Sequence, residues 1–280
     1  MIYVSTGNYK DLTGEETINL FLNNGIKNIE LSGGKYFEEP YKKIEKYIEK
    51  ANIQVHNYFP PPQEPFVLNF CSEDMEIIEK SKNLVKNNIE FTKKIKQKYV
   101  TFHAGFLIDL KFSDLGKSKN KFKILDKSKG ISNFLKNIKE LSDFAKKNDV
   151  EILLENNVIG KSNYKLYNYN PFLMTSVNDI CEIMTNTPNN VNLLLDVGHL
   201  KVSSNVLGFE KLEVFQKCKK WIKALHISEN DGNEDTNKEI KLDAWFKGYL
   251  PKADFYTLEV YSKDLELIKD QIKILNKIIS

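Results

Sequence analysis

Short apolar segments alternate with longer amphipathic segments along the whole chain. The short segments, such as LLLD at 193–196, are rich in Leu, Ile and Val, as are the buried strands of a parallel sheet. The longer segments carry apolar residues at helical spacing. The first of them follows Thr13, with Glu16 three positions later, which is a helix-capping pattern. The alternation predicts repeated strand–helix units and therefore an α/β fold.

Eight strands and about as many helices are expected from this pattern. The predicted strands cover residues 2–5, 27–31, 53–57, 98–103, 150–155, 191–196, 221–227 and 255–260. The predicted helices cover residues 13–24, 38–51, 72–96, 130–148, 176–185, 209–219 and 263–279, with a weaker one at 242–247. Parallel strands of this kind close into a barrel that leaves no exposed edge. We therefore expect a single (β/α)8 TIM barrel that forms one domain over residues 1–280.

Imidazole and carboxylate side chains are concentrated where the predicted strands end. All four histidines lie at or just after a strand end, and so do three acidic residues: His56, His103, His199, His226, Glu155, Asp196 and Glu259. The C-terminal ends of barrel strands meet at one mouth, so these side chains are expected to converge there. Buried carboxylates are unfavourable unless they are paired or bind a cation. The convergence predicts a metal site; the alternative is a solvated polar mouth with hydrogen-bonded acids.

The alternation of side chains along each strand supports this convergence. The residues one position before the strand candidates are all bulky and apolar, as expected for side chains that pack under helices: Val55, Phe102, Leu154, Leu195, Leu225 and Leu258. The residues two positions before them are more mixed, as the inside of a barrel can be: Gln54, Thr101, Leu153, Leu194, Ala224 and Thr257. All candidates except His199 are therefore expected to point inward. His199 lies three residues after Asp196, on the turn that leaves the sixth strand.

The donor set also restricts the metal. Mg and Ca prefer all-oxygen coordination, so two or more histidines count against them. A mixed set of imidazoles and carboxylates suits a divalent transition metal. We expect Zn or Mn first, with Co and Fe as further candidates.

The order of these residues resembles the xylose-isomerase-like barrel superfamily over essentially the whole chain. That group contains sugar and sugar-phosphate isomerases and epimerases, and also endonuclease IV-type abasic-site nucleases. The resemblance implies a metal quartet of Glu155, Asp196, His226 and Glu259. The spacing from Asp196 to His199 is found in both branches. His56 and the His103-Ala-Gly run resemble the nuclease branch, where the two matching histidines bind a second metal.

The chain also departs from the nuclease pattern. That branch completes a third metal site with Asp-x-His after strand 7, and the nearest candidate here is Asp243-Ala-Trp245, with tryptophan in place of histidine. A cluster of three metals is therefore not expected. All 41 basic residues are lysine, and the net charge is only +3, so a nucleic-acid partner is not expected either. Several lysines at 111–129 are expected in a solvated loop, with an anionic substrate as the alternative.

The resemblance implies a metal-dependent isomerase or epimerase of a small sugar or sugar derivative. The metal would polarise a carbonyl, and Glu155 and Glu259 would remove and return a proton on the neighbouring carbon. His199 would bind a substrate hydroxyl, and His56 and His103 would bind a second ion or the substrate. The alternative is an endonuclease IV-like two-metal phosphodiester hydrolase. A non-catalytic ligand-binding barrel is a third hypothesis.

Two further residues are candidates for substrate contacts. Glu30 points inward by the same alternation on the second strand, although it can equally be an ordinary acid of the barrel mouth. Tyr58 begins an aromatic and proline-rich segment after the third strand and is a candidate to stack on a sugar face. The alternative for this segment is a packed surface turn.

Composition indicates the redox state of the cysteines and the cellular location. Three widely spaced cysteines without a CxxC pattern indicate reduced thiols: Cys71, Cys181 and Cys218. No apolar stretch approaches the roughly 18 residues of a membrane span, and the N-terminus does not resemble a signal peptide. We expect a cytoplasmic, soluble enzyme without a membrane partner, with homo-oligomer formation left open.

Overall fold

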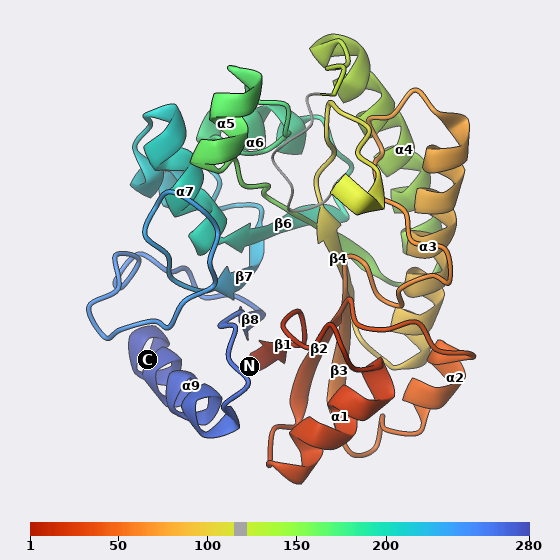
Figure 1. Cartoon of the computed structure of the whole chain (residues 1–280), viewed down its shortest axis with the longest axis vertical. Helices are drawn as coiled ribbons and strands as arrows, with labels where there is room; N and C mark the ends of the chain where they lie inside the picture. Colours follow the sequence, from red (N-terminus) through yellow and green to blue (C-terminus); the bar gives the residue numbers. More distant parts are fainter. Residues whose placement is uncertain (115–121) are drawn as a thin grey trace.

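A closed barrel of eight parallel strands forms the centre of the molecule (Figure 1). The computed structural model describes residues 1–114 and 122–280, so Lys117, Lys119 and Lys121 of the predicted solvated loop lie outside the described residues. Each strand pairs with the next one along the chain, and β8 pairs with β1. The strands are β1 Ile2–Ser5, β2 Asn28–Ser32, β3 Asn52–His56, β4 Tyr99–His103, β5 Glu151–Glu155, β6 Val191–Asp196, β7 Ile222–Ile227 and β8 Phe255–Leu258. The predicted (β/α)8 barrel is confirmed.

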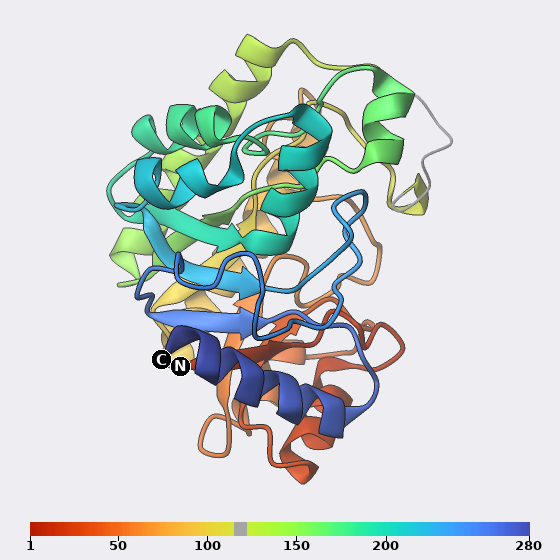
Figure 2. The same ribbon diagram turned by 90° about the vertical axis from the view of Figure 1, so that its left-hand side faces the viewer.

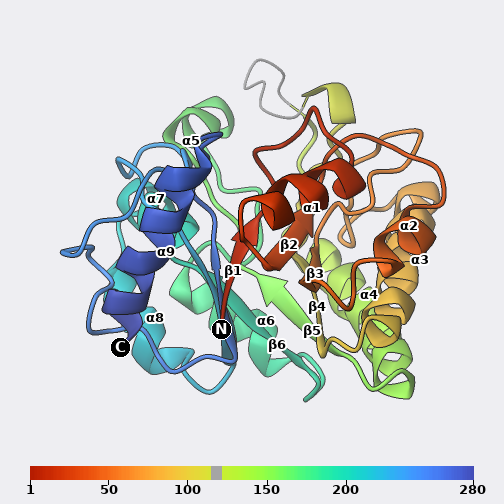
Figure 3. The ribbon, with the colours of Figure 1, turned by 90° about the horizontal axis from the view of Figure 1, so that it is seen from below.

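Helices surround this barrel (Figures 1 and 3). They are α1 Gly14–Asn23, α2 Pro40–Glu45, α3 Met75–Lys94, α4 Lys127–Lys147, α5 Lys161–Tyr167, α6 Val177–Thr185, α7 Val197–Leu207, α8 Val214–Lys217 and α9 Leu265–Ile279. The Thr13–Glu16 capping box at the start of α1 is present as predicted. None of the described helices is both long enough and apolar enough to cross a membrane. The strands all point toward one side, where long loops form the mouth, and both chain ends lie on the opposite side (Figure 2).

The helix predicted at 209–219 is wrong in its position. The main helix after β6 is α7, and the predicted segment holds only a 3-10 turn and the four-residue α8. α7 contains Gly198 and several serine and β-branched residues, which are weak helix formers, so its sequence does not show a helix. The carboxylate of Asp196 caps it by accepting the His199 N–H at 2.7 Å, and most of its side chains are buried. His199 therefore lies in the first turn of a helix.

Two other loops also differ from the prediction. The weak helix expected at 242–247 is a series of turns. No helix is predicted between residues 157 and 175, after β5, but this segment contains α5, which has no side-chain cap. Short helices of this kind depend on tertiary contacts, so local sequence gives little sign of them.

Two apolar layers fix which strand residues face the mouth. The six bulky residues predicted to pack under helices all belong to the large core between the barrel and its helices. A second cluster fills the inside of the barrel and consists of Tyr3, Tyr99, Leu153, Leu194, Ala224 and Phe255. The predicted alternation of inward and outward side chains is confirmed. Because the inner cluster fills the barrel interior with apolar groups, polar inward side chains gather at the mouth.

Gly105, in the His103-Ala-Gly run, is required by packing. A Cβ at this position would overlap the sulfur of Cys71 and lie 3.1 Å from the ring of Phe134, and both neighbours are fully buried. We expect Gly105→Ala to destabilise the protein by about 1–3 kcal/mol through overpacking, or roughly 3–10 °C in Tm. Thermal unfolding followed by circular dichroism measures this. Ser132→Ala on the exposed face of α4 is the control, and equal Tm values for both variants would contradict the argument.

Candidate functional site

The strand register brings the predicted site residues side by side. His103 at the end of β4 lies opposite Glu155 on β5, and Asp196 on β6 lies opposite His226 on β7. Glu259 directly follows β8, where its N–H donates to the carbonyl of Ile227 at 2.9 Å. Because paired residues of neighbouring strands point to the same face, their side chains share one space. All seven histidine and acidic candidates meet at the mouth, as the sequence predicts.

Four of these residues form a compact buried quartet. Glu155, Asp196, His226 and Glu259 each offer a ligand atom, and these atoms lie within 4.8 Å of one another. The Nδ1 atom of His226 is 3.3 Å from Glu155 Oε1, 3.4 Å from Glu259 Oε2 and 3.9 Å from Asp196 Oδ2. Glu155, Asp196 and His226 are completely buried, and Glu259 is 7% exposed. Such a set of one imidazole and three carboxylates matches the donors of divalent transition-metal sites.

A second group shares Glu155 with the quartet. His56 Nε2 lies 3.1 Å and His103 Nδ1 lies 3.3 Å from Glu155 Oε2, and these three ligand atoms also lie within 4.8 Å of one another. Glu155 thus turns one oxygen toward His226 and the other toward His56 and His103. A carboxylate in this position can bridge two cations.

Several polar atoms of these two groups lack hydrogen-bond partners within the described part of the chain. They are both carboxylate oxygens of Glu155, Asp196 Oδ2, His226 Nδ1 and His103 Nδ1. Buried polar atoms are normally paired, so a cluster of unpaired atoms that face one another needs an explanation. A cation at their centre would satisfy them together, and the residues present therefore fit a metal.

The rings of His56, His199 and His226 are each held by a fixed partner on one ring nitrogen. His56 Nδ1 lies 2.8 Å from Thr101 Oγ1, and His199 Nδ1 lies 2.9 Å from the carbonyl of Asn156. His226 Nε2 lies 3.1 Å from Glu30 Oε1. Such outer contacts orient the rings before any ligand binds.

Burial and neighbouring charge shift the pKa values of this cluster in opposite directions. Burial raises the pKa of Asp196 to about 8, and the charges of Glu155 and Glu259 add to this effect. Burial lowers the pKa of His103 to about 4. Burial alone would raise the pKa of Glu155, but His103, His226 and His56 outweigh it and hold that pKa well below its usual value. Perturbed pKa values of this kind are concentrated at functional sites.

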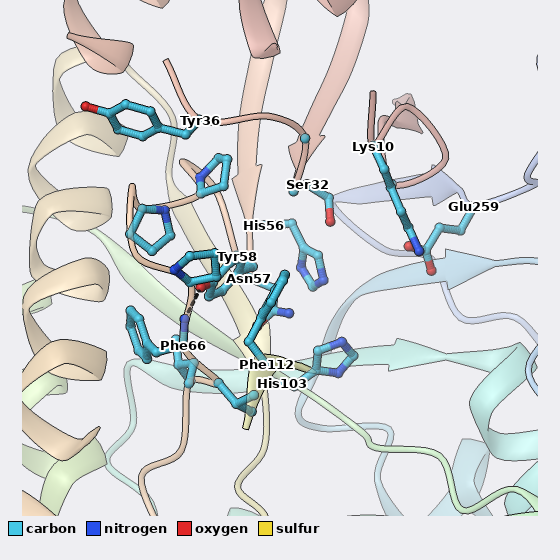
Figure 4. A pocket seen from close by; sticks show the side chains of 18 of the residues that line it. Lys10, Ser32, Tyr36, His56, Asn57, Tyr58, Phe66, His103, Phe112 and Glu259 are labelled. Carbon is cyan, nitrogen blue, oxygen red and sulfur yellow. Dashed lines mark hydrogen bonds between the residues drawn. The ribbon is translucent and has the colours of Figure 1, made fainter. Parts of the chain in front are cut away.

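A cavity of about 740 Å³ opens above the cluster. Its polar part includes His56, His103, His199 and Glu259, while aromatic and proline side chains line one wall (Figure 4). Lys10 is the sole lysine among the described residues that line it. A pocket with a large apolar wall and a few convergent polar groups is typical of small-molecule sites.

The aromatic wall contains Tyr58, the residue expected to stack on a sugar face. Its hydroxyl accepts the N–H of Phe66 at 2.6 Å, and its ring stacks on Phe112 with a centroid distance of 6.0 Å. Phe112 and Tyr36 line the same cavity and are 46% and 45% exposed. Tyr58 is therefore held within the wall, and Phe112 presents a more open ring to the cavity.

Two site residues were missed by the sequence analysis. Asp235 and Asn237, from the long loop after β7, line the cavity, and Asp235 Oδ2 lies 3.4 Å from His199 Nε2. Asp243 and Trp245, the nearest match to the Asp-x-His pattern, are not among the residues that line the cavity. Asp243 is exposed, and Trp245 packs on Phe215 with a centroid distance of 6.2 Å. The Asp-x-Asn pattern at 235–237 can be recognised in the sequence. The path of the loop that carries it, however, depends on tertiary contacts.

Glu30 lies beneath the site instead of facing the cavity. It is completely buried, does not line the cavity and contacts the His226 ring. The predicted substrate contact by Glu30 therefore has no support in this geometry.

Comparisons with known proteins agree with this architecture. Among solved structures, a D-tagatose 3-epimerase-like protein matches with a TM-score of 0.71 and 17% identity, covering 100% of this chain and 99% of that chain. The IOLI protein with a bound zinc atom matches with a TM-score of 0.69 and 18% identity, covering 100% and 98%. D-psicose 3-epimerase from Clostridium cellulolyticum H10, solved with D-tagatose, matches with a TM-score of 0.65 and 12% identity, covering 98% and 96%.

At these identities, the three structures are similar to this chain in fold. No curated protein matches the sequence. Residues 16–257 match the model of the xylose isomerase-like TIM barrel family. This match extends over most of the chain and includes all the strands from β2 to β7. The chain therefore belongs to the xylose isomerase-like TIM barrel family.

Proposed function

We propose that this protein is a divalent-metal-dependent isomerase or epimerase of a sugar or sugar derivative. The observation that carries the proposal is the quartet of Glu155, Asp196, His226 and Glu259 at the floor of a small-molecule cavity. Structures similar to this chain include enzymes named as epimerases of D-psicose and L-ribulose. The proposal assigns this class of chemistry to the site.

The quartet would hold one divalent ion, with Zn or Mn expected first. When bound, the ion supplies Lewis acidity that polarises a substrate carbonyl. His199, with Asp235 on its Nε2 side, would bind a substrate hydroxyl.

The two glutamates would move the proton on the carbon next to the carbonyl. Glu259 lines the cavity, where it would contact the substrate directly. Glu155 has no exposed atom, and His56 and His103 lie against its outer oxygen. Proton transfer to Glu155 therefore needs these two rings to move when substrate binds.

The lining of the cavity favours a small and uncharged substrate. Its aromatic wall includes the exposed ring of Phe112, and such a ring can stack on the apolar face of a sugar. A nucleic-acid site would need many cationic contacts to phosphates. Within the described residues, Lys10 alone offers such a contact in the cavity.

Hydrogen exchange at carbon provides a direct test. Purified metal-loaded protein is incubated in D2O with D-tagatose, D-psicose and L-ribulose, and proton NMR follows exchange next to the carbonyl. The proposal predicts exchange for at least one sugar, and its loss in Glu259→Gln. Absence of exchange across the panel, together with cleavage of an abasic-site duplex, would overturn it.

A two-metal phosphodiester hydrolase is the second candidate, and one observation favours it. Glu155 belongs both to the quartet and to the group with His56 and His103, as a bridging carboxylate would. Elemental analysis of the purified protein measures the number of ions per chain. Two tightly bound ions and abasic-site cleavage support the hydrolase, whereas one ion and carbon-bound exchange support the epimerase.

A further inference from the structure

The charge of Glu30 is buried directly behind a proposed metal ligand. Glu30 has no exposed surface, and its two oxygens lie 3.1 Å and 3.2 Å from His226 Nε2. The hydroxyl of Thr257 donates to Glu30 Oε2 at 2.9 Å. A carboxylate is strongly disfavoured in such a place unless a partner keeps it charged. The contacts place that partner on the far nitrogen of the His226 ring.

These contacts determine how His226 can be used. With Glu30 Oε2 accepting a hydrogen bond from Nε2, the Nε2 atom carries the proton in the neutral ring. The unprotonated Nδ1 atom then faces the carboxylates of Glu155 and Glu259. A carboxylate behind a metal-binding histidine fixes the tautomer and increases the basicity of the ligand nitrogen.

We infer that Glu30 is a positioning residue that orients His226 to bind the metal through Nδ1. Glu30 does not touch substrate, and Thr257 holds the Glu30 carboxylate in place. The inference rests on the proposed function, because it assigns a role toward the same ion. It replaces the substrate contact expected for Glu30 from the alternation of strand side chains.

Two variants separate the contributions of Glu30. Glu30→Gln keeps an acceptor oxygen but removes the charge, whereas Glu30→Leu removes both. Zinc affinity is measured by competition with a coloured chelator, and Tm is measured to verify folding. Glu49→Gln is the matched control, because Glu49 is exposed and lies between α2 and β3, on the side away from the mouth. We expect a loss of zinc affinity of about 10–100-fold in Glu30→Leu, a smaller loss in Glu30→Gln and none in the control.

The tautomer is read in the unaltered protein, so the test does not depend on a variant that folds. Long-range proton–nitrogen spectra of histidine-labelled, zinc-loaded protein identify which nitrogen of His226 carries hydrogen. Hydrogen on Nε2 supports the inference; hydrogen on Nδ1, or unchanged zinc affinity in folded Glu30→Leu, overturns it. If the unaltered protein binds no divalent ion, the proposed function fails as well. Metal binding that is insensitive to Glu30 overturns this inference alone.

An independent observation concerns two cysteines that the sequence leaves far apart. The sulfur atoms of Cys181 on α6 and Cys218 at the end of α8 lie 3.7 Å apart. Cys218 is completely buried, whereas Cys181 is partly exposed. Cys218 precedes β7, so the pair lies on the side of the barrel away from the mouth.

We propose that this pair is a site of thiol oxidation by hydrogen peroxide. The partly exposed Cys181 attacks one peroxide oxygen as its thiolate, which gives a sulfenic acid and releases the other oxygen as water after protonation. The Cys218 sulfur then attacks the Cys181 sulfur, so that an S–S bond forms and a second water leaves. The two sulfurs lose the two electrons that the peroxide gains.

Peptide mass spectrometry of peroxide-treated protein tests this pairing. We expect a Cys181–Cys218 cross-link and one remaining thiol, Cys71, which is completely buried. The cross-link closes a loop between residues 181 and 218, so a Tm increase of several degrees is also expected. Cys218→Ser should prevent both effects. Absence of the cross-link, or linkage through Cys71 or between two chains, would overturn the proposal.

Discussion

Glu259→Gln is expected to lower the rate of carbon-bound hydrogen exchange by about 10²–10⁴-fold, the usual contribution of a general acid–base group. Glutamine has nearly the same size as glutamate, so the cavity keeps its shape. It has no charge to bind a cation and no basic oxygen to take a proton. Because Glu259 lines the cavity, the loss should appear in kcat, with a smaller change in KM.

Glu155→Gln is the informative comparison. Glu155 belongs to both groups of ligand atoms, whereas Glu259 belongs to one, so this variant should lose more metal than Glu259→Gln as well as exchange activity. Metal content is measured by elemental analysis, and exchange by NMR in D2O. Glu49→Gln, with its exposed side chain away from the mouth, should match the unaltered protein in both measurements. An unchanged exchange rate in Glu259→Gln would favour a ligand-binding barrel without catalysis.

Removal of the metal is expected to lower the Tm, and the loss should grow as the pH rises. In the metal-free protein, burial raises the pKa of Asp196 to about 8, above its value in an unfolded chain. A raised pKa means that the folded state holds a proton that the unfolded state releases. This contribution to stability is complete below the unfolded pKa and is lost as the pH rises through about 8. The metal-free protein should therefore become less stable to unfolding as the pH rises through this range.

The metal-bound protein should respond differently. The metal requires ionised Asp196 and unprotonated His226 Nδ1, so binding releases protons and tightens as the pH rises. With metal about 1,000-fold above its Kd, the expected gain in Tm is on the order of 10 °C. Thermal unfolding is followed with chelator present, and again after zinc or manganese is restored. The difference in Tm between the metal-bound and the metal-free protein is measured from about pH 5 to about pH 8. A difference in Tm that becomes smaller as the pH rises would contradict the assignment of these ligands.

The predicted strands were close to the observed ones because each buried strand carries a dense apolar run with flanking turns. The helices were less predictable. The capping box of α1 is recognisable in the sequence. In contrast, α7 contains many weak helix formers, and its first turn depends on the Asp196 carboxylate and on burial. A tertiary contact of this kind outweighs local propensity.

The sequence by itself determined the alternation of strands and helices, and with it the end of the barrel where His56, His103, Glu155, Asp196, His226 and Glu259 gather. The physical reason is that strand periodicity and parallel pairing are local properties of the chain. Only the tertiary structure decided that Glu30 lies behind His226, that Asp235 reaches His199, and that Cys181 meets Cys218. Those contacts join segments distant in the chain, and their geometry depends on packing across the whole barrel.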